Sequence, residues 1–399
     1  MDEMAGTNRT LTFWYLLSII VPVTLAVRAS NNMFQTEVPL LARDYLGMSE
    51  LEIGSLAAVA SLTTFVMSAF INARLPSAGR RTLFVASSFL YAITFPFFFL
   101  VDRYTIWLVL SLAGFSLGSV MPNIITSASL LPDRLQRERL LSLYTLTLSI
   151  SLVAGPALEG YLLRSMSIRE SFLYFEVFPV VAAALSFLIA FPKETGKRPD
   201  TRGVWRNPGF RVSVLNIMTY NIPFAFILTF GGIYAEEYFH YTVSAATLLF
   251  SAFFATSMLG RLALSLRPPS RLARIMASSV ALTLLGLLMM FISRDSYMLV
   301  SSFLILGVPH GLTYPVSVVQ LSRTFDESGR AAANSLFFSV MMILSSALPF
   351  LLGLLVSYIG IRLSFAALMP VVAAIAVALA ASIRSLQGMP ERGAAGTQG

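Results

Sequence analysis

Arg28 has the clearest chemical meaning in this sequence, because it is the first charged side chain after an uncharged, mainly apolar run that begins at Leu11. A charge at bilayer depth costs about 2.5–3.5 kcal/mol even on a lenient insertion scale, so such a side chain must face water or a partner. A guanidinium can bind a carboxylate or phosphate through two parallel hydrogen bonds. Arg28 therefore indicates an anion site, unless it pairs with Glu159 or Glu176 and only holds helices together.

Polar residues accompany Arg28 at helical spacing. Positions i, i+4, i+7 and i+11 share one face of a helix, and this face carries Thr24, Arg28, Asn31 and Gln35, with Asn32 alongside. The segment is thus expected to present a cationic, amide-rich stripe to an aqueous interior. Glu37, nine residues after Arg28, is expected about half a turn away from that stripe.

Three other titratable residues are candidates for proton coupling. Glu159 and Glu176 lie in apolar stretches, where a carboxyl group can exchange a proton as its exposure alternates; the alternative for each is a solvated or ion-paired acid. His310 ionises near neutrality and stands between Gly307 and Gly311, so it is a proton-relay candidate. A lone histidine in an apolar helix is more often a satisfied core residue, and that alternative stays open.

The composition places these residues in a polytopic membrane protein. Of the 399 residues 56% are hydrophobic and only 12% are charged, with a mean hydropathy of +0.75. That length accommodates twelve spans of about 20 residues with short loops. The expected spans are 11–42, 50–73, 81–101, 104–131, 138–163, 169–191, 209–235, 243–266, 272–292, 297–322, 329–357 and 361–384. The first lacks a small-residue cleavage site, so we expect a retained span and no signal peptide.

Charge and residue usage narrow the function further. The net charge of +8 is a topology signal and not a nucleic-acid footprint, since most Lys and Arg residues fall on one side when the N-terminus is cytoplasmic. Both termini are therefore expected in the cytoplasm. With no cysteine and only two histidines, His240 and His310, we expect no disulfide, no metal and no cofactor.

The second half of the chain repeats the first at a constant offset. Gly114, Gly118 and Pro122 recur as Gly307, Gly311 and Pro315, and 307 − 114 = 193. Matched Arg, Pro, Asp and Gly residues at such positions are much less often accidental than matched apolar ones. The same offset relates Arg74, Pro76, Ser77, Asp102, Tyr104, Pro156, Gly160, Arg169 and Phe172 to Arg267, Pro269, Ser270, Asp295, Tyr297, Pro349, Gly353, Arg362 and Phe365.

The repeat predicts two domains. Residues 1–191 form an N-terminal six-helix bundle and residues 209–386 a C-terminal one, in an all-α membrane fold with pseudo-symmetry. Residues 192–208, which are polar and basic, are expected to be a cytoplasmic linker, and residues 387–399, rich in Gly and Ala, a disordered tail.

Two six-span copies with a cytoplasmic linker resemble the major facilitator superfamily, over essentially the whole chain. Its exporters and antiporters carry a small-residue pattern in helix 5; here Ser142, Ser151, Gly155, Pro156, Glu159 and Gly160 stand at that spacing, with Glu159 where the family has no side chain. The loop after helix 2 lacks the acidic residue of the family motif in Pro76-Ser77-Ala78-Gly79-Arg80-Arg81. Gly114 replaces an arginine typical of proton-coupled drug exporters, which leaves the usual coupling scheme open.

The resemblance implies that helices 1, 4, 7 and 10 line a central cavity. It directs the Arg28 stripe at the substrate and adds uncharged polar residues from the other helices. The expected substrate-binding residues are Arg28, Asn31, Asn32, Gln35, Asn123, Asn216, Tyr220, Asn221, His310 and Tyr314. Asn221 is the repeat partner of Arg28, since 221 − 28 = 193.

Small residues and prolines predict where the helices bend or pack closely. Glycine allows close approach and proline removes a backbone hydrogen bond, so rocking of two lobes about a central site is expected. The residues assigned this conformational role are Gly114, Gly118, Pro122, Gly155, Pro156, Gly307, Gly311, Pro315 and Pro349.

We therefore expect a monomeric secondary transporter of the prokaryotic cytoplasmic membrane that moves a small organic anion, a monocarboxylate above all, with a coupling proton. The first alternative is a proton-driven exporter of amphipathic cationic or neutral drugs, favoured by the helix 5 pattern and the aromatic, Met-rich interior. A transporter-like sensor is less favoured, because no soluble domain is apparent to signal through. No triad, metal or phosphate-loop constellation points to an enzyme.

Overall fold

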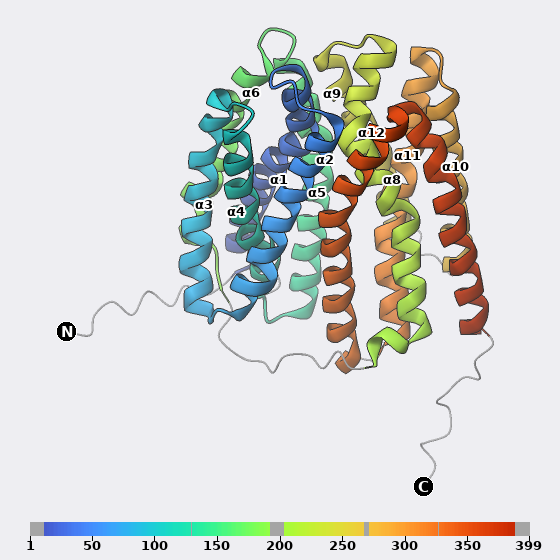
Figure 1. Ribbon diagram of the computed structural model, residues 1–399. Coiled ribbons are helices and arrows are strands. Elements are labelled where there is room, and N and C mark those ends of the chain that lie inside the picture. Colours follow the sequence, from blue (N-terminus) through green and yellow to red (C-terminus); the bar gives the residue numbers. More distant parts are fainter. Residues whose placement is uncertain (1–11, 129, 192–202, 267–270, 326, 388–399) are drawn as a thin grey trace. The chain divides into compact units, whose positions relative to one another are not determined.

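The computed structural model describes residues 12–128, 130–191, 203–266, 271–325 and 327–387, and these residues are almost entirely helical (Figure 1). The predicted linker residues 192–202 and tail residues 388–399 lie outside this description. The α-helices are α1 (Phe13–Asp44), α2 (Glu50–Val66), α3 (Ser77–Leu100), α4 (Thr105–Ala128), α5 (Arg134–Leu162), α6 (Ile168–Phe175), α7 (Val177–Leu185), α8 (Pro208–Phe239), α9 (Val243–Leu266), α10 (Leu272–Ile292), α11 (Ser296–Thr324) and α12 (Glu327–Gln387).

Eleven helical stretches of the described chain are long and apolar enough to cross a bilayer. The last of them covers two of the twelve expected spans, because α12 continues past Gly360, whose φ of 77° and ψ of 163° are not helical. Only glycine adopts such a conformation without strain. Gly360 therefore separates the spans predicted at 329–357 and 361–384, and the fold has the two six-helix halves that the repeat predicted.

The helices pack into two compact units. Unit 1 comprises Met1–Leu41 and Val59–Gly196, and unit 2 comprises Ala42–Ala58 and Lys197–Gly399. In unit 1 α3 packs against α4, and in unit 2 α8 packs against α12 and α11 against α9 and α10. The segment Ala42–Ala58, the end of α1 and the start of α2, thus belongs to the first sequence repeat but packs within unit 2.

Glycine contacts reproduce the offset of 193 in three dimensions. A Cβ atom on Gly114 would collide with the Ala60 carbonyl, and one on Gly307 would collide with the carbonyl of Phe253, the repeat partner of Ala60. Gly118 and Gly311 face the carbonyls of Thr64 and Ser257 in the same way, and these are also repeat partners. The two G-x3-G segments therefore hold their neighbouring helices at backbone contact.

Loop contacts repeat as well. Asp102 Oδ1 accepts hydrogen bonds from the Tyr104 and Thr105 amides before α4, and Asp295 Oδ1 accepts one from the Met298 amide at the start of α11. Arg169 donates to the Val101 carbonyl, while Arg362 donates to the carbonyls of Phe291 and Ser293. The polar residues matched at offset 193 therefore satisfy the same helix ends in both halves.

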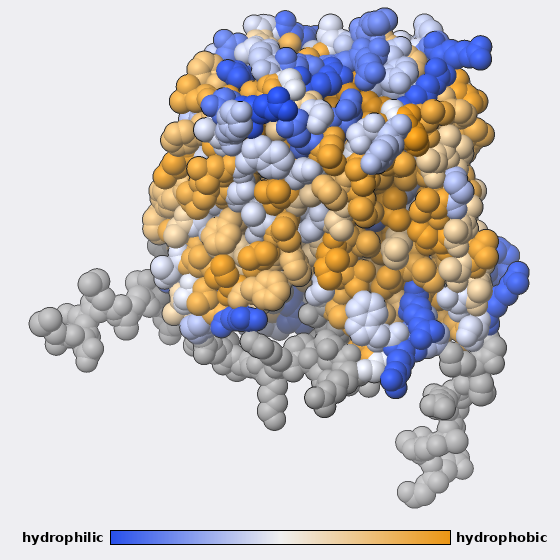
Figure 2. All heavy atoms as spheres, in the orientation of Figure 1, coloured by the Kyte–Doolittle hydropathy of each residue, from blue (hydrophilic) through white to orange (hydrophobic). Residues whose placement is uncertain are grey.

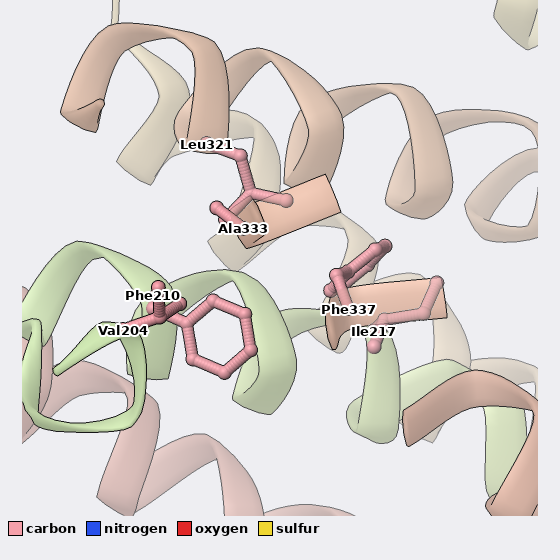
Figure 3. Close-up of a cluster of buried hydrophobic side chains, with 6 residues drawn as sticks. All are labelled: Val204, Phe210, Ile217, Leu321, Ala333 and Phe337. Atoms are coloured by element: carbon pink, nitrogen blue, oxygen red, sulfur yellow. The ribbon is translucent and has the colours of Figure 1, made fainter. Parts of the chain in front are cut away.

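An apolar cluster in unit 2 joins four segments (Figure 3). Val204 lies in the 3-10 turn η4 (Val204–Arg206), which places it beside the start of α8. Asn207 caps α8 by accepting from the Gly209 amide, and Pro208 occupies the first turn, where its missing N–H costs nothing. The other members of the cluster are Phe210, Ile217, Leu321, Ala333 and Phe337.

Hydrophobic side chains also cover much of the outside of the helices. Figure 2 shows a face that is mostly hydrophobic at mid-height, with hydrophilic residues collected toward its ends. Ile93, Leu262 and Val377 are among the large side chains that are more than one third exposed, whereas Ser116, Asn216 and Glu159 are buried. Apolar outside and partly polar inside is the arrangement that a lipid environment requires.

Candidate functional site

Arg28 lies on α1 in unit 1, half-buried and, among the described residues, without an ion pair. Its charge acts on the hydroxyl group of Tyr91 in α3, which donates to Ser30. Neither Glu159 nor Glu176, the two acids considered as its partner, is paired with it. Arg28 is therefore a cation inside the helical region that no described carboxylate neutralises.

The other members of the α1 stripe differ in accessibility. Thr24 is buried and its hydroxyl has no hydrogen-bond partner among the described residues, Asn31 is at the edge of burial with 9% exposed, and Gln35 is exposed. Asn32 donates to the Ser151 carbonyl of α5 at 3.2 Å, so its amide joins two helices of unit 1.

Three further predicted substrate ligands make hydrogen bonds between helices. Asn123 donates to Asn72 Oδ1 at 2.8 Å, Asn216 to Ser317 Oγ and the Thr313 carbonyl, and Tyr220 to the Leu306 carbonyl at 2.6 Å. All three are buried. In this conformation their donors stabilise helix packing. Among the other predicted ligands in unit 2, Asn221 is half-buried and Tyr314 is exposed.

His310 is enclosed by aromatic rings from α8 and α9. Its ring centroid lies 4.3 Å from that of Phe224 and 5.4 Å from that of Phe253, with Phe254 and Tyr220 within 6 Å. Nδ1 is 2.8 Å from the Ser257 hydroxyl, and Ser257 also borders Gly311. We call these residues the His310 aromatic group.

The predicted proton-coupling acids have different surroundings. Glu159 is fully buried in α5, and its Oε2 lies 2.9 Å from the Thr36 hydroxyl of α1. Glu37, the next residue of α1, is also fully buried and acts electrostatically on Glu159. Glu176 is half-buried at the junction of α6 and α7. The predicted position of Glu37, half a turn from Arg28, follows from the geometry of a single helix. It therefore says nothing about which residue of another helix lies near Glu37.

Sequence reasoning did not single out an ion pair in unit 2. Arg43, near the end of α1, pairs with Glu236 of α8 and donates to the Ile233 carbonyl at 3.1 Å; its Nε also pairs with Asp44 at 2.7 Å. Arg43 and Glu236 are repeat partners, since 236 − 43 = 193. The sequence did carry a signal for this pair: the two matched positions hold residues of opposite charge. Residues near a pseudo-symmetry axis can contact their own repeat partners.

Nearby, Gly54 of α2 meets α12 within unit 2. A Cβ atom on Gly54 would lie 2.9 Å from the Gly353 Cα atom, and one on Gly353 would lie 2.8 Å from the Glu50 carbonyl. Any larger side chain at either glycine would push the two helices apart. Together with the Arg43–Glu236 pair, this contact holds Ala42–Ala58 against α8 and α12.

The fold and these buried polar groups define a class: a polytopic helical membrane transporter made of two repeated six-helix halves. The family model of the Major Facilitator Superfamily matches residues 20–272 and 270–397. The chain therefore belongs to that superfamily. No curated protein matches it.

Solved structures share the fold at low sequence identity. A bacterial homologue of the human lysosomal transporter Spinster aligns at 14% identity in two inward-facing structures. The occupied one has a TM-score of 0.72 over 96% of this chain and 98% of its own; the unoccupied one has 0.73 over 97% and 100%. A mutant of the nucleoside transporter NupG aligns at 12% identity with a TM-score of 0.71, over 92% and 99%. At this identity the likeness concerns the fold alone.

Proposed function

We propose that this transporter moves a small organic anion, preferentially a monocarboxylate, and that Arg28 binds its charged end. The observation that carries the proposal is that Arg28 has no carboxylate partner among the described residues. A guanidinium held at bilayer depth without a counter-ion is unfavourable in the empty protein and favourable once an anion arrives. Substrate binding then supplies the missing partner.

A single base also limits the charge of the substrate. The repeat partner of Arg28 is Asn221, a neutral amide that is half-buried in α8. A phosphate ester with two negative charges is better matched by two bases than by one base and an amide. We therefore favour a monovalent carboxylate. Asn31 and Gln35, which follow Arg28 on the same helix α1, are the proposed neutral ligands.

Transport is proposed to occur by alternating access, driven by protons, in the cytoplasmic membrane with both termini inside. In that topology the Arg43–Glu236 pair and the Gly54–Gly353 contact lie on the outer side. Opening on that side requires Ala42–Ala58 to leave α8 and α12, which breaks the ion pair and separates the two glycines. Glu159, Glu176 and His310 are the proposed sites of proton coupling.

The competing function is export of amphipathic drugs. The His310 aromatic group favours it, because stacked aromatic rings bind planar apolar and cationic compounds. Such a site would not need Arg28. The two functions therefore predict different effects of removing the Arg28 side chain: anion binding should be lost, whereas drug binding should persist.

Thermal stabilisation of the purified protein tests the choice. A ligand present at 100 times its Kd stabilises the native state by about 2.7 kcal/mol and raises the melting temperature. The probes are lactate, gluconate and benzoate as anions, and tetraphenylphosphonium and ethidium as cations. We expect an anion to stabilise the wild type and not Arg28→Ala, with a partial effect on Arg28→Lys, which keeps the charge without the bidentate geometry. Cations that stabilise wild type and Arg28→Ala equally would replace this proposal by drug export.

A further inference from the structure

The hydroxyl group of Thr36 lies close to three oxygen atoms that normally accept hydrogen bonds, of which the Met33 carbonyl is the most distant at 3.5 Å. Its Oγ1 lies 3.0 Å from the Asn32 carbonyl, one turn earlier in α1, and 2.9 Å from Oε2 of Glu159 in α5. A hydroxyl group has one hydrogen to donate and two lone pairs to accept with. An ionised carboxylate has no hydrogen at all. With an ionised Glu159 the single hydroxyl hydrogen is shared between the acceptors, as at Thr64, whose Oγ1 lies 2.9 Å from the Ala60 carbonyl and 2.8 Å from the Gly114 carbonyl. With a protonated Glu159 each of the two contacts has a hydrogen of its own.

The Asn32 carbonyl carries no hydrogen, so only a protonated Glu159 can supply a second one. With a neutral carboxylic acid, Glu159 Oε2–H donates to Thr36 Oγ1, and Thr36 donates to the Asn32 carbonyl. The second contact is the ordinary one for threonine inside a helix, which bonds the carbonyl four residues before it. Ser30 and Thr147 do the same in α1 and α5. In the protonated form no hydrogen has to be shared between two acceptors.

The surroundings of Glu159 agree with a neutral acid. Its side chain is 0% exposed, and Oε1 has no hydrogen-bond partner among the described residues, whereas a buried carboxylate needs several donors. The charged group that acts on it is Glu37, which is also 0% exposed. Two buried like charges side by side repel, and a single proton removes that repulsion.

Other titratable groups near these helices do not compensate Glu159. On α1, Arg28 is nine residues before Glu37, about 13 Å along the helix, and its charge acts on Tyr91 of α3. The Tyr91 hydroxyl donates to Ser30 at 3.1 Å. Other described contacts between α1 and α5 are the donation of Asn32 to the Ser151 carbonyl, the approach of Gly155 to Ala29, and Arg139 over the Phe13 ring at the start of α1.

We propose that Glu159 holds the coupling proton as a neutral acid that donates to Thr36, and that Glu37 is the second carboxyl group sharing this proton. This inference rests on the proposed proton-coupled transport and gives it an atomic site. When that site becomes hydrated, Glu159 releases H⁺ to water and becomes an anion, and the Thr36 hydroxyl then turns to donate to it. Reprotonation from the opposite side restores the present hydrogen bonds.

Infrared difference spectroscopy of the substrate-free protein near neutral pH tests the proton directly. The wild type is expected to show the carbonyl band of a neutral carboxylic acid, and Glu159→Gln should remove it. Glu237→Gln, which changes an exposed acid of α8, should leave the band intact. Thr36→Val should shift the band to higher frequency, because the acid then loses its acceptor. Absence of the band in wild type, or its persistence in Glu159→Gln, would overturn the proposal.

Glutamine keeps the shape of the neutral acid and still donates to Thr36, so Glu159→Gln is expected to fold with a melting temperature within a few degrees of wild type. Glu37→Gln tests whether the proton is shared between two carboxyl groups. If it is, removing the second carboxyl group should shift the band, and the band should disappear at a different pH from that in wild type. An identical pH profile in wild type and Glu37→Gln would remove Glu37 from the site.

Transport assays then connect the proton to coupling. In proteoliposomes with labelled gluconate, Glu159→Gln should keep exchange across the membrane but lose accumulation driven by a pH gradient at least tenfold. Sodium is the competing ligand: stabilisation of wild type by NaCl but not choline chloride, abolished in Glu159→Gln, would overturn the proton assignment. If wild type moves none of the anions, the proposed function fails, while the infrared result still decides where the proton is.

Discussion

At the scale of single residues, the repeat supplies matched pairs in which one copy differs from the other. Gly47 after α1 and His240 after α8 are partners at offset 193, and both have left-handed backbones, with φ of 59° and 55°. A residue with a Cβ atom is strained there by about 1 kcal/mol. His240→Gly should therefore stabilise the protein by relieving this strain. The greater conformational entropy of glycine in the unfolded state offsets part of that stabilisation.

The matched control is Gly47→Ala. A Cβ atom on Gly47 meets nothing within 4 Å, so its cost is backbone strain alone. We expect it to destabilise by about 1 kcal/mol, measured as a lower midpoint of unfolding in detergent. If His240→Gly destabilised as much as Gly47→Ala, the side chain of His240 would be contributing contacts that outweigh its strain.

Residue types predicted which side chains matter more readily than what they contact. Arg28 and Glu159 could be recognised from the sequence because an ionisable side chain in an apolar segment is energetically costly and so indicates a functional or structural role. The interhelical hydrogen bonds of Asn123, Asn216 and Tyr220 were not recognisable, since spacing along one helix says which face a residue shares and not which helix covers that face. For the same reason the sequence did not predict that Glu37 lies near Glu159.

At the scale of helices, close packing is set by the paired glycines. Gly114→Ala and Gly307→Ala should each destabilise by about 1–3 kcal/mol, because the new methyl group meets a backbone carbonyl that cannot rotate away. Gly155→Ala is the control: its Cβ would lie 3.6 Å from Ala29 at ordinary contact distance and should be near neutral. Unfolding midpoints of the three variants check this, and equal effects would contradict the packing role.

The end of α4 nearest Asp102 gives a pH prediction. Hydrogen bonds from the Thr105 and Tyr104 amides hold the pKa of Asp102 below its usual range. Because the native pKa is the lower one, the stabilisation is complete above the unfolded pKa of about 3.9 and is lost as pH falls through the native value. Asp102→Asn should therefore flatten the acid limb of the stability curve. An unchanged acid limb would mean that this carboxylate does not contribute.

Most element boundaries could be predicted, because Pro, Gly, Asp and charged residues mark the turns. Gly360, for example, lies in the predicted break between spans, and its non-helical φ and ψ separate the two helices there. The packing of Ala42–Ala58 within unit 2 was not expected, since the repeat assigns that segment to the first half of the sequence.

At the scale of the whole molecule, the Arg43–Glu236 pair should control opening of the side on which it lies. Its side chains are 27% and 8% exposed, so it is only partly screened. A loss of 1–2 kcal/mol shifts an opening equilibrium about 5- to 30-fold. The chain has no cysteine, so buried Leu56→Cys gives one reporter thiol. Arg43→Ala and Glu236→Ala should speed its modification several-fold.

Glu237→Gln serves as the control, because this exposed acid adjoins Glu236 in sequence and takes no part in the pair. It should leave the labelling rate unchanged. Labelling as slow in Arg43→Ala as in the parent would show that the helices are held by packing at Gly54 and Gly353 alone.

The central claim is that Arg28 binds a transported anion, and counterflow in proteoliposomes tests it most directly. Labelled lactate, gluconate and benzoate are offered to vesicles loaded with the same unlabelled compound. The wild type should exchange at least one of them saturably. Arg28→Ala should lose about 10- to 150-fold in kcat/KM, the equivalent of about 1.5–3 kcal/mol for a charge-assisted hydrogen bond. Unchanged exchange by Arg28→Ala, or transport of tetraphenylphosphonium alone, would contradict the account.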